Sequence, residues 1–271
     1  MALEISMQGR TAVVKINHNA ANTLTSESFE GFRDTLKKFE NDDNVRVVIF
    51  TGNDSGYFSN GFEPALFLGQ SYEYNLQVCQ LVNETALYFF FFPKPIIACL
   101  NGHAMGAGAV FALFSDWRFM VQASTGVGGR TDAAKPATGN ARIGFPEALL
   151  GMNFPAFVAR YMQDLIGVMA TRDILFGGKS LKAAEALEIK LIDRACSESE
   201  LMAETLKFAE KLGKSPLQTL IGMKRARTEL YRTVFESLRE NDAAELAKIM
   251  TSPVTQEGLR SIVEKRRPRW S

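Results

Sequence analysis

The stretch from Pro93 to Arg118 constrains the fold of this chain more than any other segment, and it reads PKPIIACLNGHAMGAGAVFALFSDWR. The short apolar run Ile96–Leu100 predicts a buried strand, and the uninterrupted run Val110–Phe114 predicts a buried helix. Residues 101–109 between them are mostly glycine, alanine and other small residues. Backbone N–H groups at the start of a helix have no partner within the helix, and small side chains let a ligand or another backbone approach closely. The stretch therefore predicts either an anion-binding loop or a tight packing turn that holds no ligand.

The residues before this stretch predict an α/β fold. A β-branched strand over Thr11–Ile16 and a second buried strand over Val45–Thr51 flank a helix that Thr25 or Ser26 would cap. A glycine-containing loop, Asn53–Pro64, follows the second strand as the small-residue loop follows the third. Loops at the ends of neighbouring buried strands face the same crevice, where open α/β sheets bind ligands.

The remaining elements are predicted from apolar runs and turn residues. We expect a helix over 72–92 that belongs to the core or to a subunit interface, and a strand over 116–121. Residues 122–140 are polar and without apolar periodicity, which predicts a long exposed loop or hairpin. Later elements are expected as helices over 155–177 and 180–190 (capped by Ser180), a strand over 191–195, and helices over 198–213, 216–231 and towards 265. A boundary near residue 197 would separate a core, 1–197, from a helical C-terminal region, 198–271.

Composition excludes several classes of protein. The 271 residues are 46% apolar and 23% charged with a net charge of +1, so no overall field favours nucleic acid or a membrane as partner. The three cysteines lie far apart and form neither a metal-binding spacing nor a disulfide framework. The first residues lack a signal-peptide pattern, the longest apolar run is too short to span a bilayer, and the last three residues are not Ser-Lys-Leu. We therefore expect a cytoplasmic protein.

Few residues offer catalytic chemistry. There are only two histidines, His18 and His103, and no motif for a nucleophilic serine, a zinc protease or a phosphate-binding loop. The glycine spacing also departs from a dinucleotide-binding fingerprint, and no metal site is visible. Among the carboxylates, Glu147 lies between Phe145-Pro146 and three apolar residues, and apolar surroundings raise a carboxyl pKa into the range of a general base. The alternative for Glu147 is a carboxylate that only stabilises a helix N-terminus. Asp116 is expected to cap or pair structurally.

Two segments together resemble the crotonase (enoyl-CoA hydratase/isomerase) superfamily, and the resemblance extends over essentially the whole chain. The segments are Tyr57–Glu63, which reads YFSNGFE, and Lys94–Asp116, in the order and separation typical of that family. The resemblance implies a spiral of strand–strand–helix units with a helical C-terminal region that builds trimers or dimers of trimers. The expected fold class is thus α/β and crotonase-like, in a homotrimer or hexamer.

The resemblance also implies an active site for acyl-CoA thioesters. Family members hold the thioester oxygen with two backbone N–H groups, which match Phe62 and Ala107 here. Family hydratases use two glutamates; Glu147 matches one of them, and Val110 stands where the other would be. One base facing an oxyanion hole can move a proton between C2 and C4, so the resemblance implies a Δ3,Δ2-enoyl-CoA isomerase, most naturally in fatty acid β-oxidation.

Further contacts with CoA are implied at several positions, and no cofactor is required beyond the CoA of the substrate. Two alternatives remain open: another crotonase-family activity such as hydration or thioester hydrolysis, and a non-catalytic acyl-CoA-binding protein on the same fold. The preferred acyl chain length and the choice between trimer and hexamer are not written in the sequence. The implied substrate- or CoA-binding residues are Ala21, Asn22, Gly61, Leu66, Gly106, Gly108 and Lys265.

Overall fold

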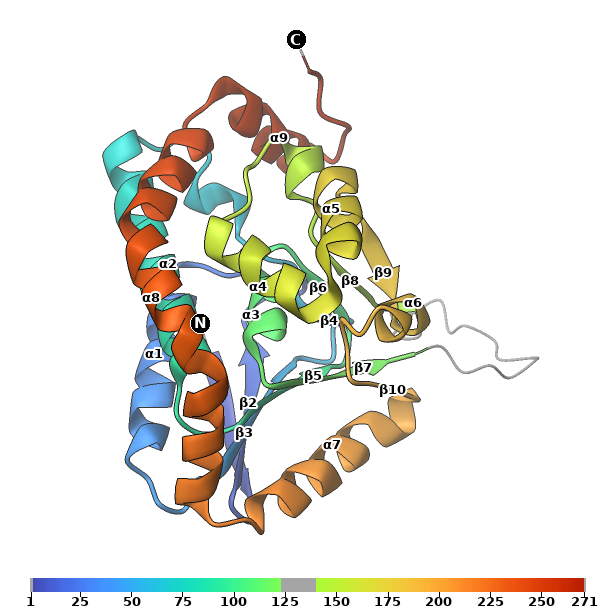
Figure 1. Cartoon of the computed structure of the whole chain (residues 1–271). Coiled ribbons are helices and arrows are strands. Elements are labelled where there is room, and N and C mark those ends of the chain that lie inside the picture. The colour runs from blue at the N-terminus through green and yellow to red at the C-terminus, as the bar shows by residue number, and fades with distance from the viewer. Residues whose placement is uncertain (1, 123–139, 271) are drawn as a thin grey trace, which may run out of the picture.

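The computed structural model describes residues 2–122 and 140–270, which form two sheets enclosed by helices (Figure 1). Most of the long polar segment predicted over 122–140 lies outside the described residues. No helix in the described part of the chain is both long and apolar enough to cross a membrane.

The larger sheet has six strands in the order β1-β2-β3-β5-β7-β10. β1 and β2 form an antiparallel hairpin, and each of the other neighbouring pairs is parallel. Every residue of β3 and β5 is buried, which explains why β5 is apolar along its whole length and β3 over its first four residues. The strands are β1 Ala2–Gln8, β2 Thr11–Asn17, β3 Val47–Gly52, β5 Ile96–Leu100, β7 Trp117–Val121 and β10 Arg194–Cys196.

A second, four-stranded sheet has the order β4-β6-β8-β9 and was not predicted from the sequence. Each long strand from β3 to β7 is followed in the chain by one of its short strands, so the chain alternates between the two sheets. A helix then follows β4 and β6, which completes strand–strand–helix units and confirms the predicted fold class. The four strands are β4 Tyr57–Ser59, β6 His103–Met105, β8 Arg142–Gly144 and β9 Ser180–Lys182.

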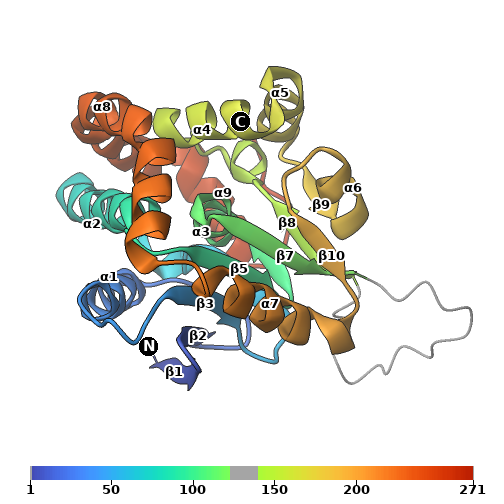
Figure 2. The ribbon, with the colours of Figure 1, turned by 60° about the horizontal axis from the view of Figure 1, so that its bottom comes forward.

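Helices cover both faces of the larger sheet. α3 (Ala107–Phe114) lies on one face, and α7 (Glu198–Gly213) packs on the opposite face against β3, β5 and β7 (Figures 1 and 2). α1 (Ser26–Glu40) and α2 (Tyr72–Phe91) pack side by side, and α2 also packs along α8. The other helices are α4 Ala156–Ile166, α5 Val168–Gly177, α6 Ala183–Glu188, α8 Leu217–Met250 and α9 Pro253–Val263.

Three sequence-based predictions are wrong in the second half of the chain. The helix over 155–177 is divided into α4 and α5 at Gly167, whose φ of +85° is outside the helical region. Residues 180–190 begin as β9 rather than as a capped helix, because Ser180 pairs with Gly144 of β8. The strand expected over 191–195 is instead β10, shifted to 194–196.

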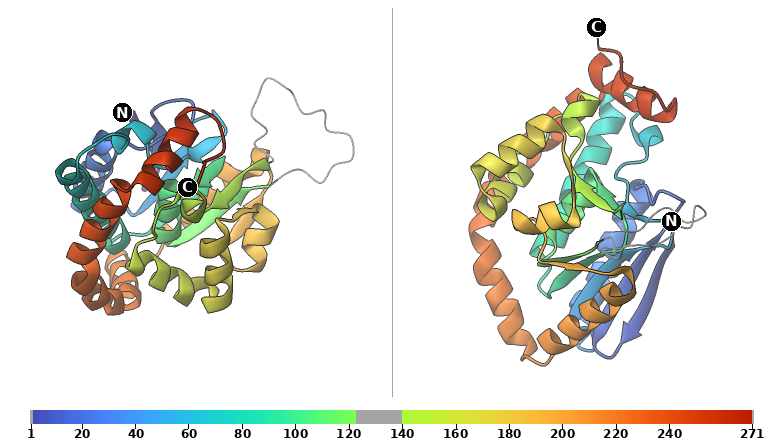
Figure 3. Two further views of the ribbon diagram at one scale, coloured as in Figure 1. Left: turned by 90° about the horizontal axis from the view of Figure 1, so that it is seen from above. Right: turned by 90° about the vertical axis from the view of Figure 1, so that its right-hand side faces the viewer.

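The helix expected over 216–231 was also predicted too short, since α8 has 34 residues and extends from Leu217 to Met250. No proline interrupts it before Pro253, which begins α9 after the capping residue Ser252. Seen from the right-hand side of Figure 1, α8 and α7 form a V whose open end faces the sheets (Figure 3).

A buried ion pair fixes α8 to the larger sheet. Lys224 Nζ lies 2.7 Å from Asp116 Oδ2, and both side chains are almost completely buried. The same carboxylate oxygen accepts a hydrogen bond from the backbone N–H of Ile96, and Arg227 pairs with the other oxygen. The structural role predicted for Asp116 is therefore confirmed. The Lys224–Asp116 ion pair sets the position of α8, and the C-terminal end of α8 lines a cavity.

Candidate active site

A largely apolar cavity of about 320 Å³ lies where α2, α3, α8 and α9 come together with two loops. The first loop leads from β4 to the short helix η1 (Pro64–Leu66), and the second from β6 to α3. The short helix η3 (Glu147–Leu150) closes another side. Five of the residues predicted from the sequence line this one cavity, namely Gly61, Phe62, Gly106, Ala107 and Glu147.

The two loops touch because glycine occupies the positions where they meet. A Cβ atom on Gly61 would lie 2.9 Å from the carbonyl oxygen of Met105 and 3.3 Å from the nitrogen of Ala107. Gly61 and Gly106 also have φ values of +82° and +52°, which favour glycine. The N–H of Gly106 donates a 3.0 Å hydrogen bond to the carbonyl oxygen of Gly144, which ties this loop to β8. The two loops and β8 are thus held together by backbone contacts.

Two backbone N–H groups at the cavity, those of Phe62 and Ala107, have no acceptor among the described residues. On either side of Phe62, Leu24 donates to the carbonyl oxygen of Gly61, and Glu63 donates to that of Leu24. This pairing leaves the intervening N–H of Phe62 unused. Ala107 is the first residue of α3, where the N–H has no partner within the helix. Two unpaired donors on adjoining loops are suited to hold an oxygen that develops negative charge.

Glu147 supplies the only ionisable side chain among the described residues that line this cavity. It follows β8 at the start of η3, and its Oε2 atom is buried without a hydrogen-bond partner. Burial raises the pKa of the Glu147 carboxyl from 4.5 to about 7, because water no longer stabilises the charged form. A Cβ atom on Gly106 would lie 3.7 Å from Glu147 Oε1, so the carboxyl group faces the loop that carries the Ala107 donor. The arrangement places a carboxyl group with a pKa near neutrality beside two backbone N–H groups that have no acceptor among the described residues.

Val110 lines the same cavity, one helical turn after Ala107 on α3. Its side chain is apolar and cannot transfer a proton. The position at which family hydratases carry a second glutamate is therefore next to the cavity, but it contributes only hydrophobic surface.

Other predicted contact residues lie around the cavity rather than on its wall. Gly108 packs against Ser59, where a Cβ atom would lie 2.6 Å from the Ser59 carbonyl oxygen. Asn22 is completely buried and donates from its amide to the carbonyl oxygens of Ile16 and Tyr57, and the carbonyl oxygen of Ala21 accepts from Asn60 N–H. These contacts support the loop that carries Phe62.

Leu66 and Lys265 also lie off the cavity wall. Leu66 is buried within η1. Lys265 follows α9, and its backbone N–H donates to the carbonyl oxygen of Ile262, a residue that lines the cavity. Glu63 accepts a hydrogen bond from Thr23 and is not a lining residue.

Sequence reasoning missed the walls that come from α2, α8 and α9. We expected residues 72–92 to be core or interface only, yet α2 contributes Val82, Asn83 and Ala86 to the cavity. An apolar helix face has the same sequence pattern whether it packs against protein or lines a cavity. The missed wall residues from the C-terminal helices are Leu246, Met250, Leu259 and Ile262.

The histidines lie outside the cavity. His103 accepts a hydrogen bond from the backbone N–H of Arg142 through Nδ1, and its ring packs against Tyr57. Within residues 2–122 and 140–270, no group of three or more His, Cys, Asp or Glu side chains is arranged to hold a metal ion.

A sequence model described as "Enoyl-CoA hydratase/isomerase" matches residues 6–271. A short-chain-enoyl-CoA hydratase from Clostridium acetobutylicum is 29% identical over 210 residues, which is 77% of this chain and 74% of the relative. A carnitinyl-CoA dehydratase from Salmonella typhi is 25% identical over 278 residues, 99% of this chain and 98% of the relative.

Among solved structures, human mitochondrial Δ3,Δ2-enoyl-CoA isomerase superposes with a TM-score of 0.86 over 97% of each chain. The two sequences are 21% identical, so this similarity concerns the fold.

Proposed function

The chain belongs to the enoyl-CoA hydratase/isomerase family, and we propose that within it this protein is a Δ3,Δ2-enoyl-CoA isomerase. The substrate would be a 3-enoyl-CoA thioester and the product the conjugated 2-enoyl-CoA. The observation that carries the proposal is that the described cavity wall holds one ionisable side chain, Glu147, while the neighbouring position on α3 is Val110.

Each step of the reaction has a group to perform it. The carboxylate of Glu147 removes a proton from C2, and the electrons move onto the thioester oxygen to form a dienolate. The N–H groups of Phe62 and Ala107 donate hydrogen bonds to that oxygen. The neutral Glu147 then returns the proton to C4, which shifts the double bond and regenerates the carboxylate. A pKa of about 7 suits this exchange, because the group must both accept and release a proton near neutral pH.

Hydration makes a different demand on the site. A hydratase must orient a water molecule and add its oxygen and proton across the double bond, for which two carboxylates are used. The apolar wall around Val110 offers no second one. The acyl chain would lie against the apolar side chains that α2, α8 and α9 contribute, such as Val82, Leu246 and Leu259.

The wider setting of the enzyme is also part of this proposal. CoA would be bound near the loop that Asn22 supports and near Lys265, whose positive charge suits the CoA phosphates. Assembly as a homotrimer or hexamer and a cytoplasmic role in β-oxidation remain predictions. Large apolar side chains such as Phe176, Met223 and Leu230 are exposed on the described chain, as expected where subunits meet.

Enoyl-CoA hydration is the second candidate activity. It is favoured by the relative from Clostridium acetobutylicum, which is named a short-chain-enoyl-CoA hydratase. For this activity Glu147 alone would have to activate the water.

A paired assay separates the two activities. Purified protein is offered 3-enoyl-CoA and, separately, 2-enoyl-CoA, and both conjugation and hydration are followed. We expect conjugation without comparable hydration, and a loss of about 10²–10⁴-fold in kcat for Glu147→Gln with CoA-ester binding retained. Full activity of Glu147→Gln would contradict the mechanism, and hydration as fast as conjugation would favour the second candidate.

Val110→Glu sharpens the same test, because it places a carboxylate one helical turn from the Ala107 donor. We expect the variant to gain hydration of 2-enoyl-CoA by about tenfold or more, through general base assistance to water. Val110→Gln, of similar size but without a titratable group, is the matched control and should gain none.

A further inference from the structure

α9 contacts the two short helices η1 and η3 beside the candidate active site, and it also forms part of the cavity wall. Leu259 and Ile262 line the cavity, and the helix packs against both η1 and η3. In Figure 1, α9 lies across the top of the molecule near these short helices. Two adjacent residues of α9, Thr255 and Gln256, make hydrogen bonds with the segments that follow η3 and η1.

Thr255 bonds directly to the turn that carries Glu147. Its side chain is completely buried, and Oγ1 donates a 2.6 Å hydrogen bond to the carbonyl oxygen of Gly151. Gly151 ends η3 in the left-handed conformation, with φ +67° and its N–H directed to the carbonyl oxygens of Ala148 and Glu147. The N–H of Met152 also donates to the carbonyl oxygen of Glu147, at 2.9 Å. Thr255 therefore holds the same four-residue turn whose first residue is the proposed base.

The backbone of α9 lies against this turn as well. A Cβ atom on Gly258 would lie 2.1 Å from the carbonyl oxygen of Leu150, so only glycine allows this approach. Leu150 is itself a lining residue of the cavity. The hydroxyl of Thr255 and the backbone at Gly258 thus contact consecutive residues at the end of this turn, Gly151 and Leu150.

Gln256 makes the corresponding contact with the segment that follows η1. Its Nε2 donates to the carbonyl oxygen of Phe67 at 3.0 Å, and its Oε1 accepts from the N–H of Gly69 at 2.8 Å. Phe67 packs edge-on against the ring of Phe62, whose N–H is one of the two unpaired donors. Adjacent residues of α9 therefore join the turn that carries Glu147 to the segment after η1, whose Phe67 packs on Phe62.

We propose that Thr255 is a positioning residue for catalysis, which holds the carboxyl group of Glu147 in the largely apolar cavity by fixing the carbonyl of Gly151. The inference rests on the proposed function only in taking Glu147 as the base. Without the hydroxyl, the Gly151 carbonyl loses its partner, the turn loosens, and water reaches the carboxyl group. A displacement of about 1 Å can lower a rate by about 10²-fold, so the effect should appear in kcat rather than in binding.

The test compares four variants with the wild-type protein. Thr255→Val removes the hydroxyl and keeps the shape of the side chain. Thr255→Ala removes both the hydroxyl and the methyl group, and Thr255→Ser keeps the hydroxyl. Thr251→Val is the matched control, because Thr251 Oγ1 donates only to carbonyl oxygens within α8, those of Ala247 and Lys248. Kinetics with 3-enoyl-CoA are measured alongside the pH titration of the Glu147 carboxyl, followed by NMR of ¹³C-labelled glutamate with Glu147→Gln to assign the signal.

We expect Thr255→Val and Thr255→Ala to lower kcat about tenfold with KM little changed, and Thr255→Ser to recover most of it. The two hydroxyl-free variants should also lower the pKa of Glu147 from about 7 towards its ordinary value of 4.5, while Thr251→Val keeps both properties. A wild-type titration in both hydroxyl-free variants would overturn the positioning role. The positioning role would also be overturned if Thr251→Val lowered kcat and the pKa of Glu147 as much as the Thr255 variants do.

The titration does not require turnover, which separates this inference from the proposed function. Wild-type protein inactive on 3-enoyl-CoA would count against the isomerase. The shift of the Glu147 pKa in Thr255→Val would still decide whether Thr255 keeps the carboxyl group dry.

Discussion

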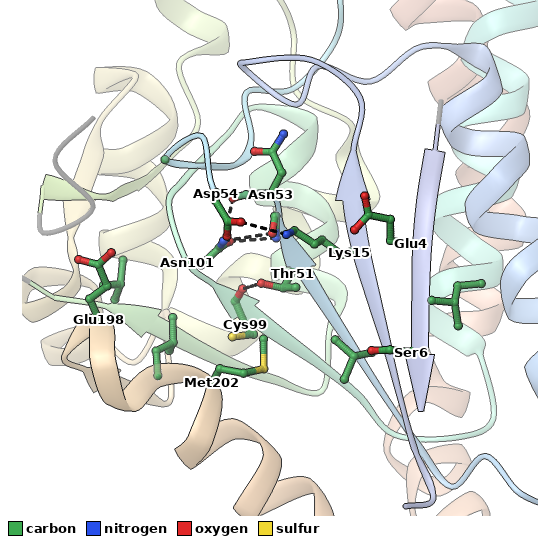
Figure 4. Close-up of a pocket in the computed structure, with 16 residues that line it drawn as sticks. Glu4, Ser6, Lys15, Thr51, Asn53, Asp54, Cys99, Asn101, Glu198 and Met202 are labelled. Atoms are coloured by element: carbon green, nitrogen blue, oxygen red, sulfur yellow. Dashed lines mark hydrogen bonds and ion pairs between the residues drawn. The ribbon is translucent and has the colours of Figure 1, made fainter. Parts of the chain in front are cut away.

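Two cavities of this molecule differ in whether their polar groups have hydrogen-bond or ion-pair partners. The second and larger, of about 660 Å³, lies on the α7 side of the six-stranded sheet, at the carboxyl ends of β3 and β5 (Figure 4). There Lys15 pairs with Asp54 at 3.2 Å, the amide of Asn101 donates to the carbonyl oxygens of Gly52 and Asn53, and Thr51 donates to that of Cys99. These groups satisfy one another.

The smaller cavity leaves three of its polar groups without a partner among the described residues. The N–H groups of Phe62 and Ala107 have no acceptor in the described part of the chain, and Glu147 Oε2 is buried without a partner. A buried polar group without a hydrogen bond destabilises the folded state by about 1–3 kcal/mol. Groups left in that condition are available to a substrate at once, whereas the paired groups of the larger cavity would first have to break their own bonds. Unsatisfied hydrogen-bonding capacity, more than volume, therefore distinguishes the candidate active site.

The largest effect should come from moving one of the unpaired donors. Gly106 precedes Ala107 with φ +52° and ψ −125°, a conformation that alanine adopts only with strain. We expect Gly106→Ala to displace the Ala107 N–H and to lower kcat by about 10²–10³-fold, as measured by the conjugation of 3-enoyl-CoA.

Gly9→Ala is the control for backbone strain, because Gly9 has φ +60° in the turn between β1 and β2 and does not line either cavity. It should lower the thermal midpoint of unfolding without changing kcat. Equal kinetic losses in both variants would mean that general destabilisation, rather than the lost donor, explains the result.

A second, smaller effect concerns the stability cost of keeping Glu147 unpaired. Because the pKa of the folded-state carboxyl is raised from 4.5 to about 7, the folded protein binds more protons than the unfolded chain between these pH values. This contribution to stability is fully present below pH 4.5 and is lost as the pH rises through 7, by up to about 3 kcal/mol.

Glu147→Gln should lack this dependence. Urea unfolding of the two proteins between pH 5 and 8 should therefore show the wild-type free energy of unfolding falling relative to that of the variant. Parallel curves across this range would contradict the raised pKa. The activity of the wild-type protein should rise through the same range, since proton removal from C2 needs the carboxylate.

The smallest effect is expected in the larger cavity. Lys15→Met removes the ion pair with Asp54, whose side chain is 92% exposed, so the free energy of unfolding should change by no more than about 1 kcal/mol. Steady-state kinetics with 3-enoyl-CoA should match the wild-type protein. A clear loss of activity would show that the two cavities are coupled, and the contrast drawn between them would fail.

Prediction from the sequence succeeded for elements whose burial produces a continuous or regularly spaced pattern of apolar residues. The strand Ile96–Leu100 and the helix over 198–213 have their predicted bounds, because each is specified by its own apolar pattern. The strands of the second sheet escaped prediction because three residues are too few to show a period. Their pairing depends on partners far along the chain, such as Ser180 for Gly144.

For the candidate site, the sequence by itself determined which chemical groups are present. It placed glycines where the loops must meet, one glutamate after β8, and Val110 where a second carboxylate would stand. These are properties of single positions and their immediate neighbours, which a sequence records directly.

Only the tertiary structure decided what those groups can do. The raised pKa of Glu147, the unpaired N–H groups of Phe62 and Ala107, and the wall supplied by α2, α8 and α9 all arise from residues distant in sequence. Desolvation and hydrogen-bond satisfaction depend on everything that surrounds an atom in space. For that reason the contact between Thr255 and Gly151, which links residues 104 positions apart, could not be inferred before the fold was known.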